Sequence, residues 1–278
     1  MTGPRDPLED RIHLFAHGGV EGAVLKILDN EPLPLNDLLD DAHRLPEDQT
    51  LPFAYTCCYI RHHGRHVMVD GGIDGDEVAA QLVFLDVRPQ DVDLVLITHV
   101  DRDHVAGLIL QIGDGELTYP NARYAIDAGL WRLLHEDGTY DELPKHLQRL
   151  FRALVARLED RVILCDAETE VANGITFVPC PGHRPGHAAY ELDSNSGTAA
   201  GPILHVGDAF LHPLFLEHPD WPLAGDTNPD QAVESRRTLI ERIAKTNALV
   251  IGTHFPWPGI GRIRTDETSI PWVSSADR

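Results

Sequence analysis

The stretch Thr98–Gly107, THVDRDHVAG, decides how this chain is interpreted. Within six positions it holds four side chains that can bind a metal ion: His99, Asp101, Asp103 and His104. They follow the short apolar run LVLIT, which is typical of a strand buried on both faces. A tight turn before a helix can direct such side chains at two neighbouring points, and imidazole and carboxylate bind zinc, manganese and iron(II). The stretch therefore predicts a metal site, and its four donors suit a dinuclear one.

Three further apolar runs end in side chains of the same kind. The run Ile175–Val178 continues into PCPGHRPGH, which offers His183 on a turn stiffened by glycine and proline. The run ILHV ends at Asp208, and the run ALVIG ends at His254. Because ligands of layered α/β proteins gather beyond the carboxyl ends of strands, we expect these four strand ends to meet at one site.

The remaining pattern alternates strands with helices. Two β-rich runs, at 55–60 and 66–70, flank HHGR and predict a hairpin. Helical patterns cover residues 76–85, 143–159 and 228–244. We expect a single domain over residues 1–278, of α/β class, with sheets sandwiched between helices. The Pro- and Asp-rich stretch 29–52 predicts a long loop that serves as a lid.

Charge and composition limit the classes of partner that the chain can bind. The 278 residues carry 23 Lys+Arg against 44 Asp+Glu, a formal net charge of −21. Such a chain repels phosphate backbones and anionic lipid, so we expect a small-molecule substrate and neither a nucleic-acid nor a membrane partner. Four cysteines without a CxxC pair, and an N-terminus without an apolar leader, favour a cytoplasmic protein. The sequence leaves open whether the chain forms a homodimer.

Together, the motifs resemble the metallo-β-lactamase superfamily, whose signature is H-x-H-x-D-H, then P-G-H, G-D and a final H, in that order. The resemblance runs from about residue 53 to the C-terminus. It implies an αββα sandwich, in which two mixed β-sheets are flanked by helices. Carried over residue by residue, it assigns one metal to His99, Asp101 and His183, and the other to Asp103, His104 and His254. Asp208 would bridge the two ions.

The same resemblance implies a metal-dependent hydrolase with two divalent ions, zinc foremost, that hold a bridging hydroxide. Asp103 and Asp208 are then the catalytic carboxylates, with Asp103 orienting the nucleophile. Asp70 would brace the metal loop, and His187 would support the ligands without being one. His212 is expected to be a supporting histidine, with proton donation as its alternative role.

Two segments point to a narrower branch. GTHFPWPGIGRIR, and the preceding GDAFLHP…DWP…D-x-N-P…RR, resemble methyl parathion hydrolase and the related lactonases and arylesterases. This resemblance implies that the substrate is a small ester or lactone, with a phosphotriester as a further option. Phe210, Phe255 and Trp257 are the candidates for an apolar substrate pocket, with core packing as the alternative for each.

One position departs from the signature, because Asp101 stands where the second histidine is expected. Two divalent ions, two carboxylates and a hydroxide leave a charge of about +1, and Asp101 reduces this to about 0. A carboxylate there also favours harder ions, so manganese and iron(II) are the alternatives to zinc. Two other functions remain open: an acyl-thioesterase of the same fold, and a catalytically silent sensor or effector whose metal site Asp101 has impaired.

Overall fold

The computed structural model describes residues 7–45, 49–111, 115–194, 200–264 and 272–275. Its strands are β1 (Ile12–His17), β2 (Val20–Leu28), β3 (Leu33–Pro34), β4 (Thr50–Leu51), β5 (Tyr55–His62), β6 (Arg65–Val69), β7 (Leu94–Leu96), β8 (Arg123–Asp127), β9 (Val162–Cys165), β10 (Thr169–Ala172), β11 (Ile175–Pro179), β12 (Ala188–Leu192), β13 (Ile203–His205), β14 (Leu249–Ile251), β15 (Ile260–Ile263) and β16 (Trp272–Ser274). Its helices are α1 (Leu35–Leu38), α2 (Gly75–Phe84), α3 (Arg102–Val105), α4 (Ala128–Leu133), α5 (Lys145–Leu158), α6 (Leu214–Glu217) and α7 (Pro229–Thr246). Short 3-10 turns are η1 (Glu9–Arg11), η2 (Asp41–His43), η3 (Pro89–Asp91), η4 (Ala106–Leu108) and η5 (Gly207–Ala209).

The first sheet has the order β1-β2-β5-β6-β7-β8-β9. The pairs from β1 to β6 are antiparallel, which includes the expected β5–β6 hairpin. The pairs from β6 to β9 are parallel. Helices α2, α4 and α5 lie between the parallel strands in the chain, because parallel neighbours need a crossover.

The second sheet has the order β10-β11-β12-β13-β14-β15-β16. Within the described part of this sheet only β13 and β14 pair in parallel, and α7 forms their crossover. Strands β7, β13 and β14 are three residues long and buried at every position, as their short, mostly apolar runs predict.

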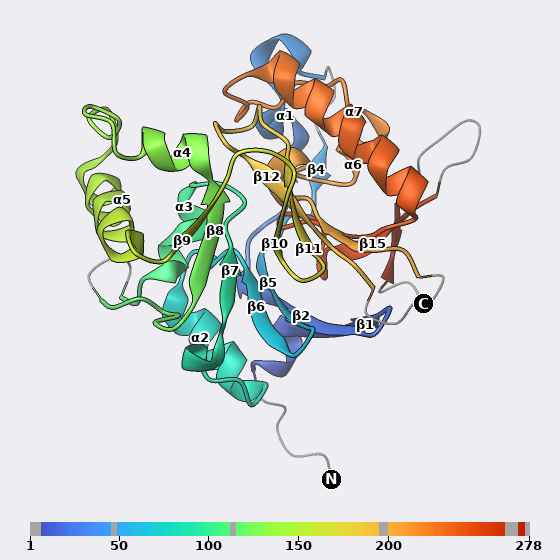
Figure 1. Ribbon diagram of the computed structural model, residues 1–278. Coiled ribbons are helices and arrows are strands. Elements are labelled where there is room, and N and C mark those ends of the chain that lie inside the picture. The colour runs from blue at the N-terminus through green and yellow to red at the C-terminus, as the bar shows by residue number, and fades with distance from the viewer. Residues whose placement is uncertain (1–6, 46–48, 112–114, 195–199, 265–271, 276–278) are drawn as a thin grey trace.

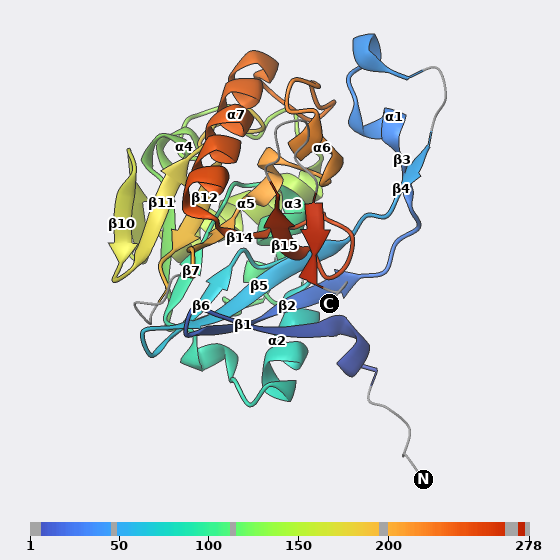
Figure 2. The same cartoon turned by 90° about the vertical axis from the view of Figure 1, so that its right-hand side faces the viewer.

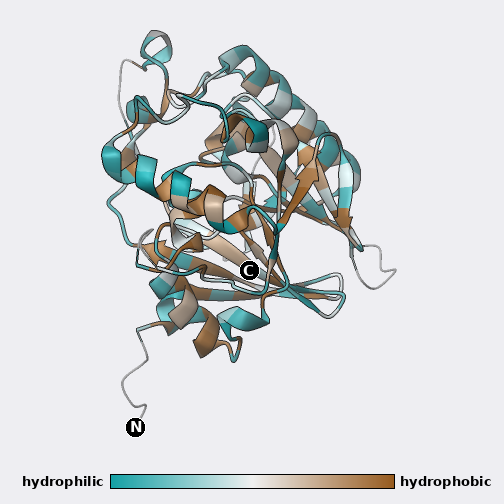
Figure 3. Ribbon diagram, turned by 60° about the vertical axis from the view of Figure 1, so that its left-hand side comes forward, coloured by the Kyte–Doolittle hydropathy of each residue, from teal (hydrophilic) through white to brown (hydrophobic). Residues whose placement is uncertain are grey.

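The layers follow from where apolar side chains are buried. One core, with Val95 and Leu154, lies between the first sheet and helices α2, α4 and α5. A second, with Leu96 and Ile251, joins the two sheets, and a third, with Leu239, fills the space beneath α6 and α7. Figure 1 shows the two sheets side by side with helices outside both, and Figure 3 shows mostly apolar strands between amphipathic helices. This is the expected αββα sandwich, which confirms the predicted fold class.

The stretch 29–52 has more structure than the expected loop. It holds the two-stranded ribbon β3–β4, α1 and η2, and it protrudes beside α6 and α7 in Figure 2. Leu35 and Leu39 are buried in the same core as Phe215, and Leu39 forms an isolated bridge with Leu223. The segment is therefore anchored on the second half of the molecule by its leucines.

A close backbone contact fixes the loop that carries the motif. Gly71 N–H donates to His104 O at 2.7 Å, and Gly107 N–H donates to Gly72 O at 2.9 Å. A Cβ on Gly107 would lie 2.1 Å from Gly71 O, so no side chain fits between the two loops. The glycines at 71, 72 and 107 thereby let α3 and η4 dock beside the end of β6.

We predict that Gly107→Ala lowers the free energy of unfolding by about 3 kcal/mol or more, because backbone atoms must move to admit the new methyl group. The control is Gly64→Ala in the β5–β6 turn, where φ is +77° and nothing lies within 4 Å of the added Cβ. It should cost only about 1–2 kcal/mol of left-handed backbone strain. Urea titration of both variants measures the difference, and equal losses would contradict the close-contact explanation.

Candidate metal centre

The first group of ligands comes from three segments. His99 lies beyond the end of β7, Asp101 directly precedes α3, and His183 follows β11. Asp101 Oδ2 lies 3.6 Å from His99 Nε2 and 3.6 Å from His183 Nε2. Ligands bonded to one ion at about 2.1 Å in tetrahedral geometry stand roughly 3.4 Å apart. The spacing of these three donors therefore suits a single cation.

The second group lies beside the first. Asp103 and His104 belong to α3, and His254 lies beyond β14. Asp103 Oδ2 is 3.3 Å from His254 Nε2 and 3.8 Å from His104 Nε2. These three donors also lie close enough to one another to hold one ion.

Asp208 in η5 stands between the two groups. Its Oδ1 lies 3.2 Å from His104 Nε2, and its Oδ2 lies 3.3 Å from His254 Nε2. The same Oδ2 is 3.6 Å from His183 Nε2 and 3.8 Å from His99 Nε2. One carboxylate thus reaches an imidazole of both groups, as a bridging ligand must.

Asp70 orients the rings that come from the motif. Its Oδ1 accepts Thr98 N–H at 2.8 Å, and its Oδ2 accepts Thr98 Oγ1–H at 2.8 Å and faces His104 Nδ1 at 2.7 Å. Because the Thr98 hydroxyl proton is donated to Asp70, its oxygen can accept from His99 Nδ1, 3.0 Å away. The geometry supports the bracing role expected of Asp70.

Other acceptors orient the remaining two rings. His254 Nδ1 lies 2.9 Å from Ala54 O, and His183 Nδ1 lies 3.3 Å from Asp226 Oδ1. The other oxygen of Asp226 pairs with Arg236 of α7 at 3.0 Å, and both side chains are completely buried. The D-x-N-P…RR pattern thus contributes the pair that supports His183, a role that sequence reasoning did not assign.

The donor set fits a divalent cation. With each Nδ1 held by a protein acceptor, the Nε2 atoms turn inward, and three of them, on His99, His104 and His183, are buried without a hydrogen-bond partner in the described chain. Asp208 Oδ1 is in the same state. Buried polar atoms without partners are costly, and a cation is the partner that both imidazole nitrogens and carboxylate oxygens accept.

Electrostatics favour positive charge at this point. Burial would raise the pKa of Asp208, but the neighbouring rings of His104 and His254 hold that pKa well below its usual range. Despite its burial, the same two rings lower the pKa of Asp103 to about 2. Burial opposes protonation of His254, yet Asp208 and Asp103 raise its pKa to about 9. The carboxylates are therefore ionised at neutral pH and draw cations to their centre.

His187 and His212 lie outside the ligand groups. His187 Nε2 accepts the backbone N–H of Asp208 at 3.0 Å, and burial holds the pKa of His187 well below its usual value. This neutral ring positions the backbone of Asp208, which agrees with a supporting role. His212 Nδ1 accepts Leu214 N–H, and burial lowers the pKa of His212 to about 4, so its ring is neutral at neutral pH.

The aromatic pocket candidates behave differently from one another. Phe210 and Phe255 are 0% exposed and belong to the core beneath α6 and α7, so core packing accounts for both. Trp257 is half-buried and lines a cavity of about 200 Å³ together with Phe53 and Ala54. Phe53 stacks on the His254 ring with centroids 4.5 Å apart, so this cavity shares a wall with the metal centre.

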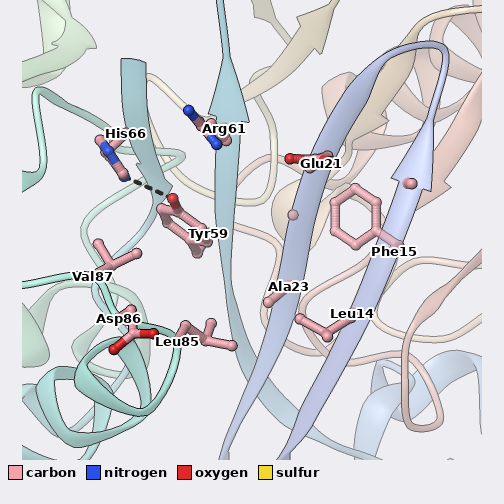
Figure 4. Close-up of a pocket in the computed structure, with 12 residues that line it drawn as sticks. Leu14, Phe15, Glu21, Ala23, Tyr59, Arg61, His66, Leu85, Asp86 and Val87 are labelled. Carbon is pink, nitrogen blue, oxygen red and sulfur yellow. Dashed lines mark hydrogen bonds between the residues drawn. The ribbon is translucent and has the colours of Figure 1, made fainter. Parts of the chain in front are cut away.

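A larger cavity, of about 630 Å³, lies elsewhere on the outer face of the first sheet (Figure 4). Its lining includes Leu14, Tyr59 and Arg61, and Tyr59 Oη is 2.7 Å from His66 Nδ1. None of the grouped ligands lines it. No grouped ligand lines the smaller cavity either, but its Phe53 stacks on the ring of His254.

Sequence reasoning missed one polar side chain at the centre altogether. Arg184 follows His183 directly in PGHRPGH, and its Nε donates to Asp101 Oδ1 at 2.8 Å. Its position inside the motif was the available signal, but sequence spacing alone cannot show that it turns back toward α3.

Comparison with known proteins identifies the family of the chain. A family model described as the metallo-beta-lactamase superfamily matches residues 50–254, and the chain belongs to that superfamily. Probable metallo-hydrolases of Mycobacterium bovis and Mycobacterium tuberculosis are each 32% identical over 152 residues, or 53% of this chain and 46% of theirs. The chain thus spans about half the length of these curated relatives. An exodeoxyribonuclease of Streptococcus pneumoniae is 27% identical over 93 residues, or 32% of each chain.

Solved structures share the fold over nearly the whole chain. The hydrolase AbOPH of the β-lactamase superfamily has a TM-score of 0.77 at 21% identity, covering 94% of this chain and 96% of its own. AidC, a dizinc quorum-quenching lactonase in complex with a product, has a TM-score of 0.74 at 20% identity, covering 95% and 97%. At such identities the likeness shows the fold.

Among the described residues, no helix is both long and apolar enough to cross a membrane.

We predict that zinc or manganese, added to chelator-treated protein, raises its melting temperature, because the cation binds only the folded arrangement. His254→Ala should shrink this shift markedly. His146→Ala, which removes an exposed histidine of α5, should leave the shift as in the parent. Differential scanning fluorimetry measures it, and an equal shift in all three proteins would place the binding elsewhere.

Proposed function

We propose that this chain is a metal-dependent hydrolase that cleaves a small-molecule ester or lactone at a two-ion centre. The observation that carries the proposal is the convergence of seven ligand side chains, with Asp208 between the other six and their Nε2 and Oδ atoms turned inward. The fold shared with a dizinc lactonase supports it. When bound, the divalent ions would supply Lewis acidity and an acidified water at neutral pH.

The protein's own groups would divide the remaining work. Asp208 reaches imidazoles of both ligand groups and would fix the distance between the two groups. Asp103 is ionised, and its side chain is 24% exposed, so it can accept a hydrogen bond from an attacking water and orient it. Phe53 and Trp257 would exclude water and hold the apolar part of the substrate.

The rival functions fit the chain less well. A thioesterase acting on coenzyme A or an acyl carrier needs cations for a large anionic partner, and a net charge of −21 opposes such an encounter. The same charge disfavours DNA, despite the short match to an exodeoxyribonuclease. A silent sensor would lack part of the ligand set. Here Asp101 Oδ2 lies close enough to the Nε2 atoms of His99 and His183 to share one ion with them.

The test is activity of metal-reconstituted protein against lactones, aryl esters, thioesters, phosphotriesters and β-lactams, with the metal content of each preparation measured. We expect about two ions per chain and turnover of lactones or aryl esters. Asp208→Asn keeps the side-chain size but removes the charge, and it should lower kcat/KM at least a hundredfold. Metal-loaded protein that turns over only thioesters would contradict the ester and lactone assignment, and failure to load any ion would favour the sensor.

We further predict that Trp257→Ala raises KM for aryl or long-chain acyl substrates about tenfold, since the lost apolar contact is worth roughly 1.5 kcal/mol. Its kcat should change little, because the side chain is expected to contact the part of the substrate that does not react. Phe84→Ala, which removes a 41%-exposed aromatic at the end of α2, is the control. Steady-state kinetics distinguish the two, and an unchanged KM for Trp257→Ala would move the pocket away from this wall.

A further inference from the structure

Arg184 makes a set of contacts that fixes its side chain. Its Nε donates to Asp101 Oδ1 at 2.8 Å, and its Nη1 donates to His183 O at 3.0 Å and to Gly225 O. Its side chain is 30% exposed, and that of Asp101 is 26% exposed. The turn after β11 thus carries a candidate ligand, His183, and also Arg184, whose guanidinium group holds a second candidate ligand, Asp101.

This contact leaves one oxygen of Asp101 available. Oδ1 is engaged by the guanidinium, whereas Oδ2 is directed at the Nε2 atoms of His99 and His183, 3.6 Å from each. An imidazole at the same position would present one donor atom and no charge. Asp101 paired with Arg184 does the same, because the guanidinium binds one oxygen and cancels the carboxylate charge.

We propose that Arg184 is a positioning residue that turns Asp101 into a one-oxygen, charge-neutralised ligand, in the place where related sites use an imidazole. The inference rests on the proposed metal centre and extends it. With Arg184 included, the formal charge of the centre returns from about 0 to about +1. The centre then keeps its attraction for a developing negative charge, despite the extra carboxylate.

Arginine suits this role better than lysine. Its planar fork lets Nε bind the carboxylate while Nη1 binds the carbonyls of His183 and Gly225. A lysine would keep the charge but offers a single nitrogen, so it cannot fill both places at once. The fork therefore fixes the direction of Oδ2 as well as supplying charge.

The test compares affinities for two ions of different hardness. Without Arg184, Oδ1 is released, and Asp101 can offer both oxygens, which suits manganese better than zinc. We expect Arg184→Gln to shift the Mn²⁺-to-Zn²⁺ affinity ratio at least tenfold toward manganese. The ratio is measured on the chelator-treated full chain, by calorimetry for Mn²⁺ and by competition with a chromogenic chelator for Zn²⁺.

The matched control is Arg102→Gln. It removes the same charge from the neighbouring ligand motif, at an exposed side chain of α3. Its ratio should stay within twofold of the parent value, since a loss of charge alone affects both divalent ions alike. A merely structural role of Arg184 would weaken both ions equally, so an unchanged ratio in Arg184→Gln overturns the proposal.

A second background tests the coupling to Asp101 itself. In Asp101→His there is no carboxylate for Arg184 to hold, so adding Arg184→Gln should leave the ratio within twofold. A tenfold shift in that background as well would overturn the proposal, because the effect would not pass through Asp101. Parent protein that binds neither ion overturns this inference and the metal centre together. Normal binding with an unchanged ratio overturns only the role of Arg184.

Discussion

The structure around the candidate site depends on one constraint, the orientation of four imidazole rings. Each ring has its Nδ1 held by an acceptor of the protein: the Thr98 hydroxyl, the carboxylates of Asp70 and Asp226, and the carbonyl of Ala54. The opposite nitrogens therefore face inward, toward the two ligand groups and Asp208 between them. A single side chain rotated away would leave a buried carboxylate without its partner, which explains why the acceptors come from well-anchored segments.

The positions of the candidate ligands could be predicted from the sequence, because short buried strands have recognisable, mostly apolar sequences. LVLIT, ILHV and ALVIG are short, mostly apolar runs, and each ends within a few residues of a ligand. The order of ligands along the chain then follows from where strands end. Strands such as β2 and β12 are not followed directly by a candidate ligand, so their sequences did not predict them, although both lie inside the sheets.

The supporting residues were harder to predict, for a physical reason. Arg184 and Asp226 act through contacts between loops that lie 41 or more positions apart, and sequence spacing does not encode how two loops pack. Aromatic residues near the ligands were ambiguous for a related reason. Phe210 and Phe255 neighbour the ligands in sequence but point into the core, whereas Phe53, much earlier in the chain, stacks on His254.

The buried pair of Asp226 and Arg236 couples the candidate metal centre to α7. Arg236 sits in α7 and also binds the carbonyls of Pro219 and Trp221, so the helix, the preceding loop and the ring of His183 form one connected unit. Any ion bound through His183 then stabilises α7 against local opening, by linkage between occupancy and unfolding. Release of such an ion would therefore lower the free energy of local unfolding of α7, through the linkage between binding and unfolding.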